Sequence, residues 1–423
     1  MRFRVTASCC TLLLLLGAAR VSAQQAAGQA LALARAGRLD SALVLLSRAR
    51  ATDPDDTELQ LAHARVLGWA GRRRQSIALY DTLLARHPQH VEAMIGLGYV
   101  YHWEGRETAA KHQADAAIER DSTNADALAL RRAIRVATRP SLESSANWSN
   151  DSDHNTNFWQ THSLTLPLTA GLDLLAAGNV LQASDRLRDA WRYGGEAGLA
   201  WSAGQVEARA LAGARRLDPD AGDSRTSATY RGSLRWRPAP AFGVGAGYAR
   251  YPFDEIASLI ERNLNIESLE GDLDVHPASE LTLTGGGGAL WLSDGNRRKE
   301  ARAAVTQRVG EYITIGAAGR AFGYRERGVG YFSPDRFHLL EGTAALRVGE
   351  REWDGTVAGG LGGQQIGREG DTQTEWHVEA RVGVNWGDGN RVEGFGGVTN
   401  NAASSTTGAF RYRTAGMRLR LGL

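Results

Sequence analysis

Charged and polar side chains alternate with apolar ones through the larger, C-terminal part of this 423-residue chain. The clearest row lies between residues 375 and 386, where Glu375, His377, Glu379 and Arg381 carry the reactive groups. Carboxylates, guanidinium groups and an imidazole in one row could hydrogen-bond sugar hydroxyls or select ions by charge. Alternatively, opposite charges on neighbouring strands pair and stiffen a sheet. The residue types leave both interpretations open.

Motifs of enzymes and metal sites do not occur in the sequence. It contains no G-x-S-x-G, no phosphate-binding loop and no H-E-x-x-H, and its 10 histidines show no metal-ligand spacing. Asp153 with His154, or Asp335 with His338, could assemble a hydrolase site with a serine, but no pattern supports this. We therefore predict that the protein is not an enzyme and has no catalytic residues, cofactor or metal.

The alternation has the period of a β-strand, and one face of residues 375–386 suits lipid. Its apolar positions run from Trp376 through aliphatic residues to Trp386. Indoles favour the two headgroup levels of a membrane, and about ten residues suffice for a tilted strand to cross. In a membrane barrel the charged positions would line the lumen. These candidates are Arg231, Arg235, Arg237, Glu341, Arg347, Glu375, His377, Glu379, Arg381, Arg418 and Arg420.

Connections between the predicted strands alternate in length, as they do in outer-membrane barrels. Short connections lie near 169–171, 203–204, 238–240, 276–279, 310, 349–351 and 387–389. Longer ones lie at 150–157, 185–196, 216–227, 252–262, 293–297, 324–336, 365–373 and 399–408. This pattern predicts an antiparallel transmembrane β-barrel of about sixteen strands with both ends on the periplasmic side. A barrel of that width leaves an aqueous lumen.

The last residues alternate in the same way, with Met417 and three leucines opposite arginines. This looks like the terminal strand that the barrel-assembly machinery recognises, so we expect that machinery as a partner during biogenesis. The chain ends on Leu423, where a terminal Phe is usual. Phe410 and Tyr412 have the opposite parity to Leu423, which predicts a β-bulge in this strand.

Residues 24–137 have helical apolar spacing and repeat themselves. Three Gly-Arg pairs begin at Gly37, Gly71 and Gly105 and are 34 residues apart (71 − 37 and 105 − 71). A small residue precedes each pair by seven positions: Ala30, Ala64 and Gly98. Period and pattern resemble the tetratricopeptide repeat and predict an α-solenoid of about three helix pairs. Its concave surface would suit an extended ligand or a periplasmic partner protein.

Aromatic residues recur at the repeat spacing. Trp69 and Trp103 occupy matched positions, and with Tyr99 and His102 they could form a patch in the groove of the solenoid. Aromatic rings at repeat spacing are also typical of packing between repeats. Both interpretations remain open at this stage.

The N-terminus predicts export. Arg2 and Arg4 precede an apolar run, and Val21-Ser22-Ala23 suits signal peptidase. Both cysteines, Cys9 and Cys10, lie within this signal. We predict a signal peptide at 1–23, a periplasmic repeat domain at 24–139 and an outer-membrane barrel at 140–423. The formal net charge of +2 makes a nucleic-acid partner a poor candidate.

Two short segments resemble known families. The run Ala64-Arg65-Val66-Leu67-Gly68-Trp69-Ala70-Gly71-Arg72, with the barrel that follows, resembles the YaiO-type outer-membrane proteins. The segment 330–337, with Tyr331, Phe332 and Pro334, is similar to one in the barrel of cellulose synthase operon protein C, an exopolysaccharide export porin. The resemblance implies an outer-membrane barrel surrounded by lipid and makes these three residues outer-loop candidates. It does not imply cellulose, because the cellulose export proteins have a far longer repeat array.

These patterns lead to two expectations of function. The first is a passive conduit for export of a polysaccharide, with repeats that recruit a partner. The second is a non-transporting anchor or surface receptor that carries a periplasmic protein-binding module. A conduit needs an open lumen, whereas an anchor can be plugged.

Overall fold

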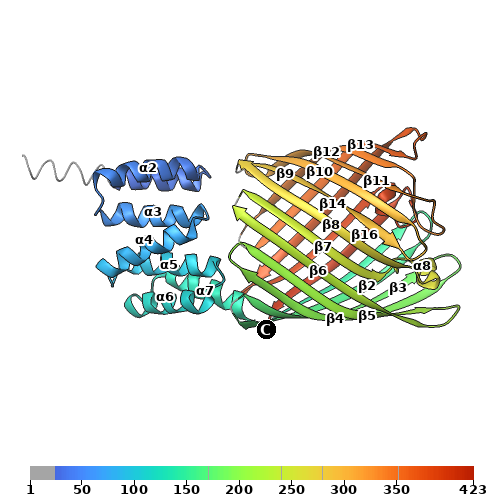
Figure 1. Ribbon diagram of the computed structural model, residues 1–423, viewed down its shortest axis with the longest axis horizontal. Coiled ribbons are helices and arrows are strands. Elements are labelled where there is room, and N and C mark those ends of the chain that lie inside the picture. Colours follow the sequence, from blue (N-terminus) through green and yellow to red (C-terminus); the bar gives the residue numbers. More distant parts are fainter. Residues whose placement is uncertain (1–23, 170, 240, 279, 351) are drawn as a thin grey trace, which may run out of the picture. The chain divides into compact units, whose positions relative to one another are not determined.

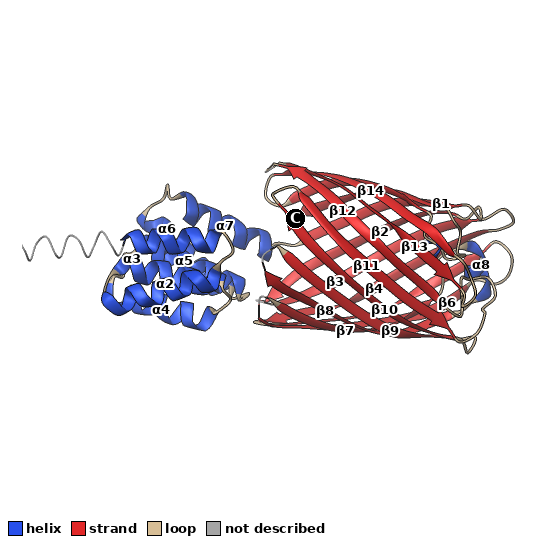
Figure 2. Cartoon of the chain, turned by 90° about the horizontal axis from the view of Figure 1, so that it is seen from above, coloured by secondary structure: helices blue, strands red, loops and turns tan. Residues whose placement is uncertain are grey.

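The computed structural model describes residues 24–423 except 170, 240, 279 and 351. The predicted signal peptide lies outside the described residues. The chain forms two compact units, one up to Ala137 and one from Thr138 onward. The first is helical and the second is a β-barrel (Figures 1 and 2).

The helical unit is a stack of helix pairs. Residues 24–35 are helical and precede α2 (Leu39–Thr52), α3 (Thr57–Trp69), α4 (Arg73–Arg86), α5 (Val91–Trp103), α6 (Glu107–Arg120) and α7 (Ala125–Thr138). Gly37, Gly71 and Gly105 have φ of 78°, 71° and 71° between the helices of each pair. Only glycine adopts this left-handed conformation at no steric cost, which explains the 34-residue recurrence. The predicted solenoid of three repeats is confirmed, with α7 as a closing helix.

Small residues stand where the helices cross. Ala30 and Ala64 are fully buried, and a Cβ on Gly98 would come within 2.6 Å of the Leu130 side chain. Backbones can approach this closely only where side chains are small. Among the described helices, none has both the length and the apolar character needed to span a membrane.

The second unit is a closed barrel of sixteen antiparallel strands, as predicted. The strands are β1 (Ser141–Asp151), β2 (Thr156–Thr169), β3 (Leu172–Ser184), β4 (Asp189–Ala203), β5 (Val206–Pro219), β6 (Arg225–Ala239), β7 (Phe242–Pro252), β8 (Asn265–Ala278), β9 (Leu281–Leu292), β10 (Arg297–Val309), β11 (Ile313–Tyr324), β12 (Phe337–Gly349), β13 (Trp353–Ile366), β14 (Thr372–Trp386), β15 (Asn390–Thr399) and β16 (Tyr412–Gly422). A short helix, α8 (Ala257–Arg262), lies between β7 and β8. Strand β1 closes the barrel on β16, with Ser141 opposite Gly422. We call the end of the barrel at which β1 begins and β16 ends the proximal end, and the opposite end the distal end.

The outer surface of the barrel is apolar. On β14 the exposed side chains run from Trp376 through Val378, Val382 and Val384 to Trp386. On β4, Trp191 and Tyr193 are exposed near the distal end and Trp201 near the proximal end. Aromatic side chains at both ends of an aliphatic band suit the two interfaces of a bilayer.

Two of the predicted long connections were wrong in extent. The connections expected at 185–196 and 216–227 are shorter, because β3 and β4 pair as far as Ser184 and Asp189, and β5 ends at Pro219. The polar residues that suggested loops occupy inward positions of strands, where Arg192 and Glu196 form ion pairs. An inward charge in a barrel strand resembles a loop residue in sequence.

The predicted bulge in the terminal strand was also wrong. Strand β16 pairs in continuous register with β1 and with β15 from Tyr412 onward, and Phe410 precedes the strand. Tyr412 shares the parity of Arg418 and Arg420, so its side chain needs no bulge to face inward. Register shifts occur elsewhere, at the proximal ends of β2, β6 and β8.

Candidate functional site: the inner wall and distal end of the barrel

The charged candidates lie on the strand face opposite the exposed apolar residues, which is the inner wall of the barrel. Several of them form ion pairs, most of them between strands and two within β14. Arg231 pairs with Glu196, Arg235 with Asp272 and Asp274, Arg237 with Glu207, Arg381 with Glu379, Arg418 with Glu143 and Glu393, and His377 with Glu341 and Glu375. Arg347 and Arg420 lie on the same face near the proximal end. The wall therefore combines donors and acceptors in a pattern of paired charges.

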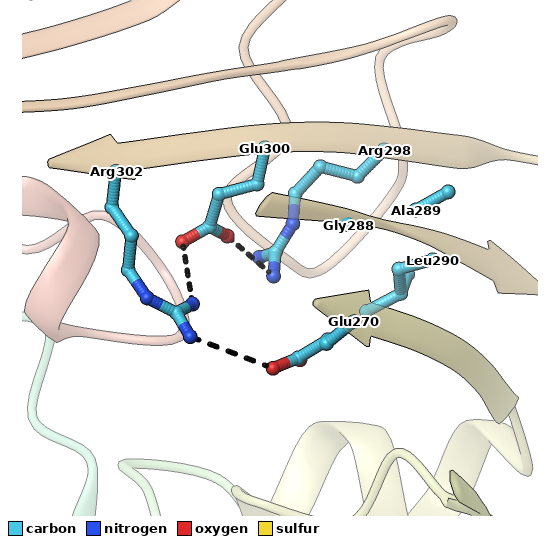
Figure 3. Close-up of a pocket in the computed structure, with 7 residues that line it drawn as sticks. All are labelled: Glu270, Gly288, Ala289, Leu290, Arg298, Glu300 and Arg302. Carbon is cyan, nitrogen blue, oxygen red and sulfur yellow. Dashed lines mark ion pairs between the residues drawn. The ribbon is translucent and has the colours of Figure 1, made fainter. Parts of the chain in front are cut away.

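Figure 3 shows a second group of inner-wall charges, which the sequence pattern had not singled out. Glu300 of β10 lies 3.0 Å from Arg298 and 2.9 Å from Arg320, and Arg302 reaches both Glu300 and Glu270. The alternation rule that identified β14 applies to residues 298–302 as well, so the sequence contained the signal. These part-exposed pairs contribute about 0–1 kcal/mol each to stability. Their effect is to coat the wall with polar groups.

Glycines on β9 make room for these long side chains. A Cβ on Gly286 would lie 3.2 Å from Nε of Arg302, and one on Gly288 would lie 2.5 Å from the Leu269 carbonyl oxygen. The run of glycines from 285 to 288 is thus part of a strand that lies close to its neighbours and to an arginine, as the alternation predicts.

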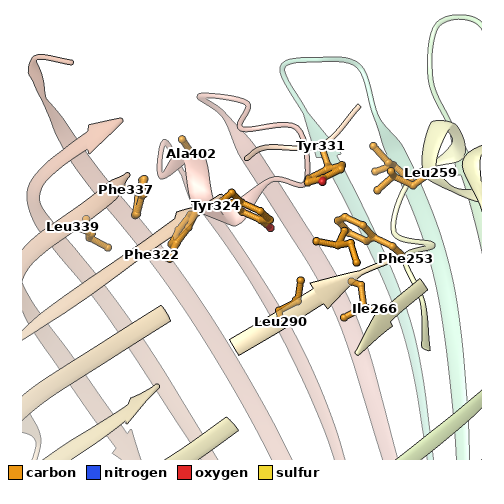
Figure 4. Packing of buried hydrophobic residues seen from close by; sticks show 12 residues of the cluster. Phe253, Leu259, Ile266, Leu290, Phe322, Tyr324, Tyr331, Phe337, Leu339 and Ala402 are labelled. Atoms are coloured by element: carbon orange, nitrogen blue, oxygen red, sulfur yellow. The ribbon is translucent and has the colours of Figure 1, made fainter. Parts of the chain in front are cut away.

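The distal end is occupied by an apolar cluster, which with its loops we call the distal plug (Figure 4). Three connecting segments form it, at 253–264, 325–336 and 400–411. They contribute Phe253, Ile256, Leu259, Tyr331 and Ala402, which pack on strand residues Ile266, Leu290, Leu292, Phe322, Tyr324, Phe337 and Leu339. Burial of so many large apolar side chains favours the packed state by roughly 25 cal/mol per Å² of apolar surface.

The plug crosses the barrel mouth. The β7–β8 and β15–β16 connections are separated by eight strands of the sixteen (15 − 7), so they start on opposite sides of the ring. Nevertheless Thr406 of the second donates a hydrogen bond of 2.6 Å to the Glu255 carboxylate of the first. The amide of Phe332 also donates to the Thr406 carbonyl at 2.8 Å. The three segments are therefore joined to one another over the lumen.

Asp254 anchors the plug to the wall. Its side chain is 2% exposed and lies 3.0 Å from both Arg192 of β4 and Arg215 of β5, whose side chains are 12% and 15% exposed. The neighbouring Glu255 is exposed in the barrel mouth, where desolvation by the surrounding protein, with the charge of Asp254, raises its pKa against the hydrogen bond from Thr406. A buried acid between two buried arginines holds the segment at a fixed place on the wall.

The outer-loop candidates lie within the distal plug. Tyr331 is buried; its hydroxyl donates to Asp294 and accepts from Asn296, and burial raises its pKa to about 12. Phe332 contacts Phe322 and Phe337 edge-on, and the Pro334 carbonyl accepts from the Tyr324 amide. These side chains thus pack into the plug.

The repeat-groove candidates are only partly brought together. The rings of Tyr99 and Trp103 lie 5.9 Å apart, and His102 pairs with Glu107 at 2.9 Å. Trp69 packs instead against the cluster of the first repeat. Trp103 is partly exposed and also reaches Gly68 of the preceding repeat.

The two acid–histidine pairs lie in different surroundings. His154 contacts Arg186, whereas Asp335 pairs with Arg368 and His338 contacts Arg336. Within the described hydrogen bonds, neither pair is linked to a serine.

A closed barrel with an apolar, aromatic-ringed exterior and a charged inner wall defines the class: this is a porin-like β-barrel of the outer-membrane type that carries helical repeats. No family model and no curated protein matches the chain. The chain is similar to a solved structure described as a bacterial polysaccharide outer membrane secretin, at 11% identity and a TM-score of 0.56. That match covers 68% of this chain and 99% of the other.

Two further solved structures match parts of the chain. One is CdiB from Acinetobacter baumannii, at 10% identity and a TM-score of 0.44 over 67% of this chain and 60% of that one. The other is a thermophilic TPR protein from Thermus thermophilus, at 22% identity and a TM-score of 0.26 over 27% of this chain and 65% of that one. The similarity to the secretin shows the fold alone.

Proposed function

We propose that this protein is an outer-membrane conduit for export of a polysaccharide, closed at rest by the distal plug. The observation that carries the proposal is the inner wall of paired arginines and carboxylates, such as Arg320 with Glu300, inside a sixteen-strand barrel. Sixteen-strand porins leave an aqueous channel. Paired charges offer many hydrogen-bond donors and acceptors with little net field, which suits a neutral chain rich in hydroxyl groups.

Two further considerations support the substrate and the orientation. One similar solved barrel is described as a polysaccharide secretin. In outer-membrane barrels the longer loops face outward, so the distal plug would lie at the cell surface and the proximal end at the periplasm. The repeats, 24–139, would then recruit a periplasmic partner after removal of the signal peptide 1–23. The barrel, 140–423, would be inserted by the barrel-assembly machinery, and the candidate wall residues would contact the passing chain.

The second candidate function is a non-transporting anchor or receptor. The observation that favours it is the plug itself, because a permanently closed barrel only needs to hold its repeats at the membrane. The YaiO-type resemblance is compatible with either function.

Single-channel recording of the full chain in a planar bilayer separates the two. The conduit should open in brief steps, and neutral linear oligosaccharides should block the current at a rate proportional to their concentration. A folded barrel that stays silent even when the plug is destabilised by Asp254→Asn would contradict the conduit and support the anchor.

A further inference from the structure

Three side chains with metal-binding groups meet on the inner wall near the distal end. Glu341 belongs to β12, and Glu375 and His377 belong to β14. One donor atom from each lies within 4.8 Å of the other two. No metal was predicted from the sequence, because these ligands come from two strands far apart along the chain and show no metal-ligand spacing.

Glycines on the intervening strand β13 allow this meeting. In the register of the sheet, Gly362 lies between Glu341 and Glu375, and Gly360 lies beside His377. A Cβ on Gly360 would clash with the imidazole Cε1 and come within 2.6 Å of Oε2 of Glu341. Strand β13 thus leaves free the space in which the side chains of its two neighbours converge.

The Glu375 carboxylate is buried and makes no hydrogen bond, although His377 lies 3.6 Å from Oε1. Its side chain is 0% exposed, and neither of its oxygens accepts a hydrogen bond from a described residue. Oε2 of Glu341 also lacks such a bond, although Nδ1 of His377 is 3.1 Å away. Two carboxylates brought together in a buried place repel each other unless a cation or a proton compensates them.

We propose that Glu341, Glu375 and His377 form a binding site for a divalent ion of the zinc class. Two carboxylates and one imidazole are a donor set that Zn²⁺ accepts, with a fourth position left for water. Bonds of about 2.0–2.2 Å at tetrahedral angles place ligand atoms roughly 3.3–3.6 Å apart. Nδ1 of His377 lies 3.1 Å from Oε2 of Glu341 and 3.6 Å from Oε1 of Glu375, so small shifts would complete the site. The ion would join β12 to β14 across β13.

The test uses the full chain without a histidine tag, refolded in detergent with Zn²⁺ and desalted before its metal content is measured. The wild type should retain a single Zn²⁺ per chain, and refolding with Co²⁺ should give the visible absorption of a four- or five-coordinate ion. Glu375→Gln and His377→Ala should each lower metal retention at least tenfold. Gly360→Ala, which leaves all three ligands in place but fills their space, should lower it as well.

Glu267→Gln is the matched control. Glu267 lies near the distal end of β8 and pairs with Arg250 at 3.6 Å, so this variant also removes one strand carboxylate and should retain the metal. Heat-modified mobility in electrophoresis confirms that each variant is folded. Equal retention by the wild type and Glu375→Gln would overturn the proposal. So would a wild type that holds no metal, which would indicate that the two carboxyls share a proton instead.

Discussion

Asp254→Asn is the substitution that most directly probes the closure of the barrel. It keeps the shape of the side chain but removes the charge that lies 3.0 Å from both Arg192 and Arg215. Removing one partner of a buried ion pair costs about 3–5 kcal/mol, because the remaining charges stay buried without compensation. If about 3 kcal/mol of this cost falls on the closed state, the ratio of open to closed barrels rises about 150-fold.

Open probability in planar bilayers measures this ratio. The control is Glu261→Gln in the same loop, since Glu261 pairs with Arg188 at 2.7 Å but both side chains are 41% exposed. Such a surface pair contributes about 0–1 kcal/mol, so the control should change the ratio less than about fivefold. The reasoning is refuted if the two variants open equally often, or if Asp254→Asn opens no more often than the wild type.

Three further predictions concern pH and packing. Burial, followed by the charges of Arg50 and Arg72, lowers the pKa of His63 to about 4. The unfolded chain therefore binds the His63 proton more tightly than the folded chain does. The contribution of neutral His63 to the stability of the repeats is therefore complete above pH 6.5. It falls as the pH approaches 4, by about 1 kcal/mol after allowance for partial exposure. Circular dichroism melts of the full chain should show this loss, and His63→Gln should flatten it. Desolvation in the barrel mouth raises the pKa of Glu255, so its contribution to the stability of the plug is complete below the ordinary carboxyl pKa and is lost as the pH rises through the raised value. Open probability should therefore rise with pH in the wild type, and an equal rise in Glu255→Gln would refute this cause. Gly98→Val should destabilise the repeats by about 1–3 kcal/mol, because its Cβ would clash with Leu130, and an unchanged melting temperature would contradict that packing.

Periodicity made the architecture predictable. Each helix pair needs a left-handed residue at its turn, so Gly37, Gly71 and Gly105 mark the repeat in sequence and in structure. Barrel strands alternate between polar residues on the inner face and apolar residues on the outer face, and β14 displays both. Such local requirements place particular residue types at a fixed spacing, so they can be recognised in the sequence.

Tertiary contacts explain what the sequence could not predict. The hydrogen bond from Thr406 to Glu255 joins residues 151 positions apart, and no local sequence pattern predicts it. The same holds for Asp254 between Arg192 and Arg215, and for Glu341 beside His377. Residues 330–337 resembled an exposed loop because their sequence is polar and aromatic, whereas Tyr331 is buried in the plug. Long-range partners of loop residues depend on which strands the barrel places opposite each other.

The most direct test of the plugged conduit joins the two sides of the mouth covalently. Glu255→Cys and Thr406→Cys would be combined and linked with a short, cleavable thiol crosslinker, and release of a neutral oligosaccharide from proteoliposomes would be measured. The account predicts that release stops when the link is made and returns when it is cleaved. Equal release in both states would contradict passage through the distal mouth.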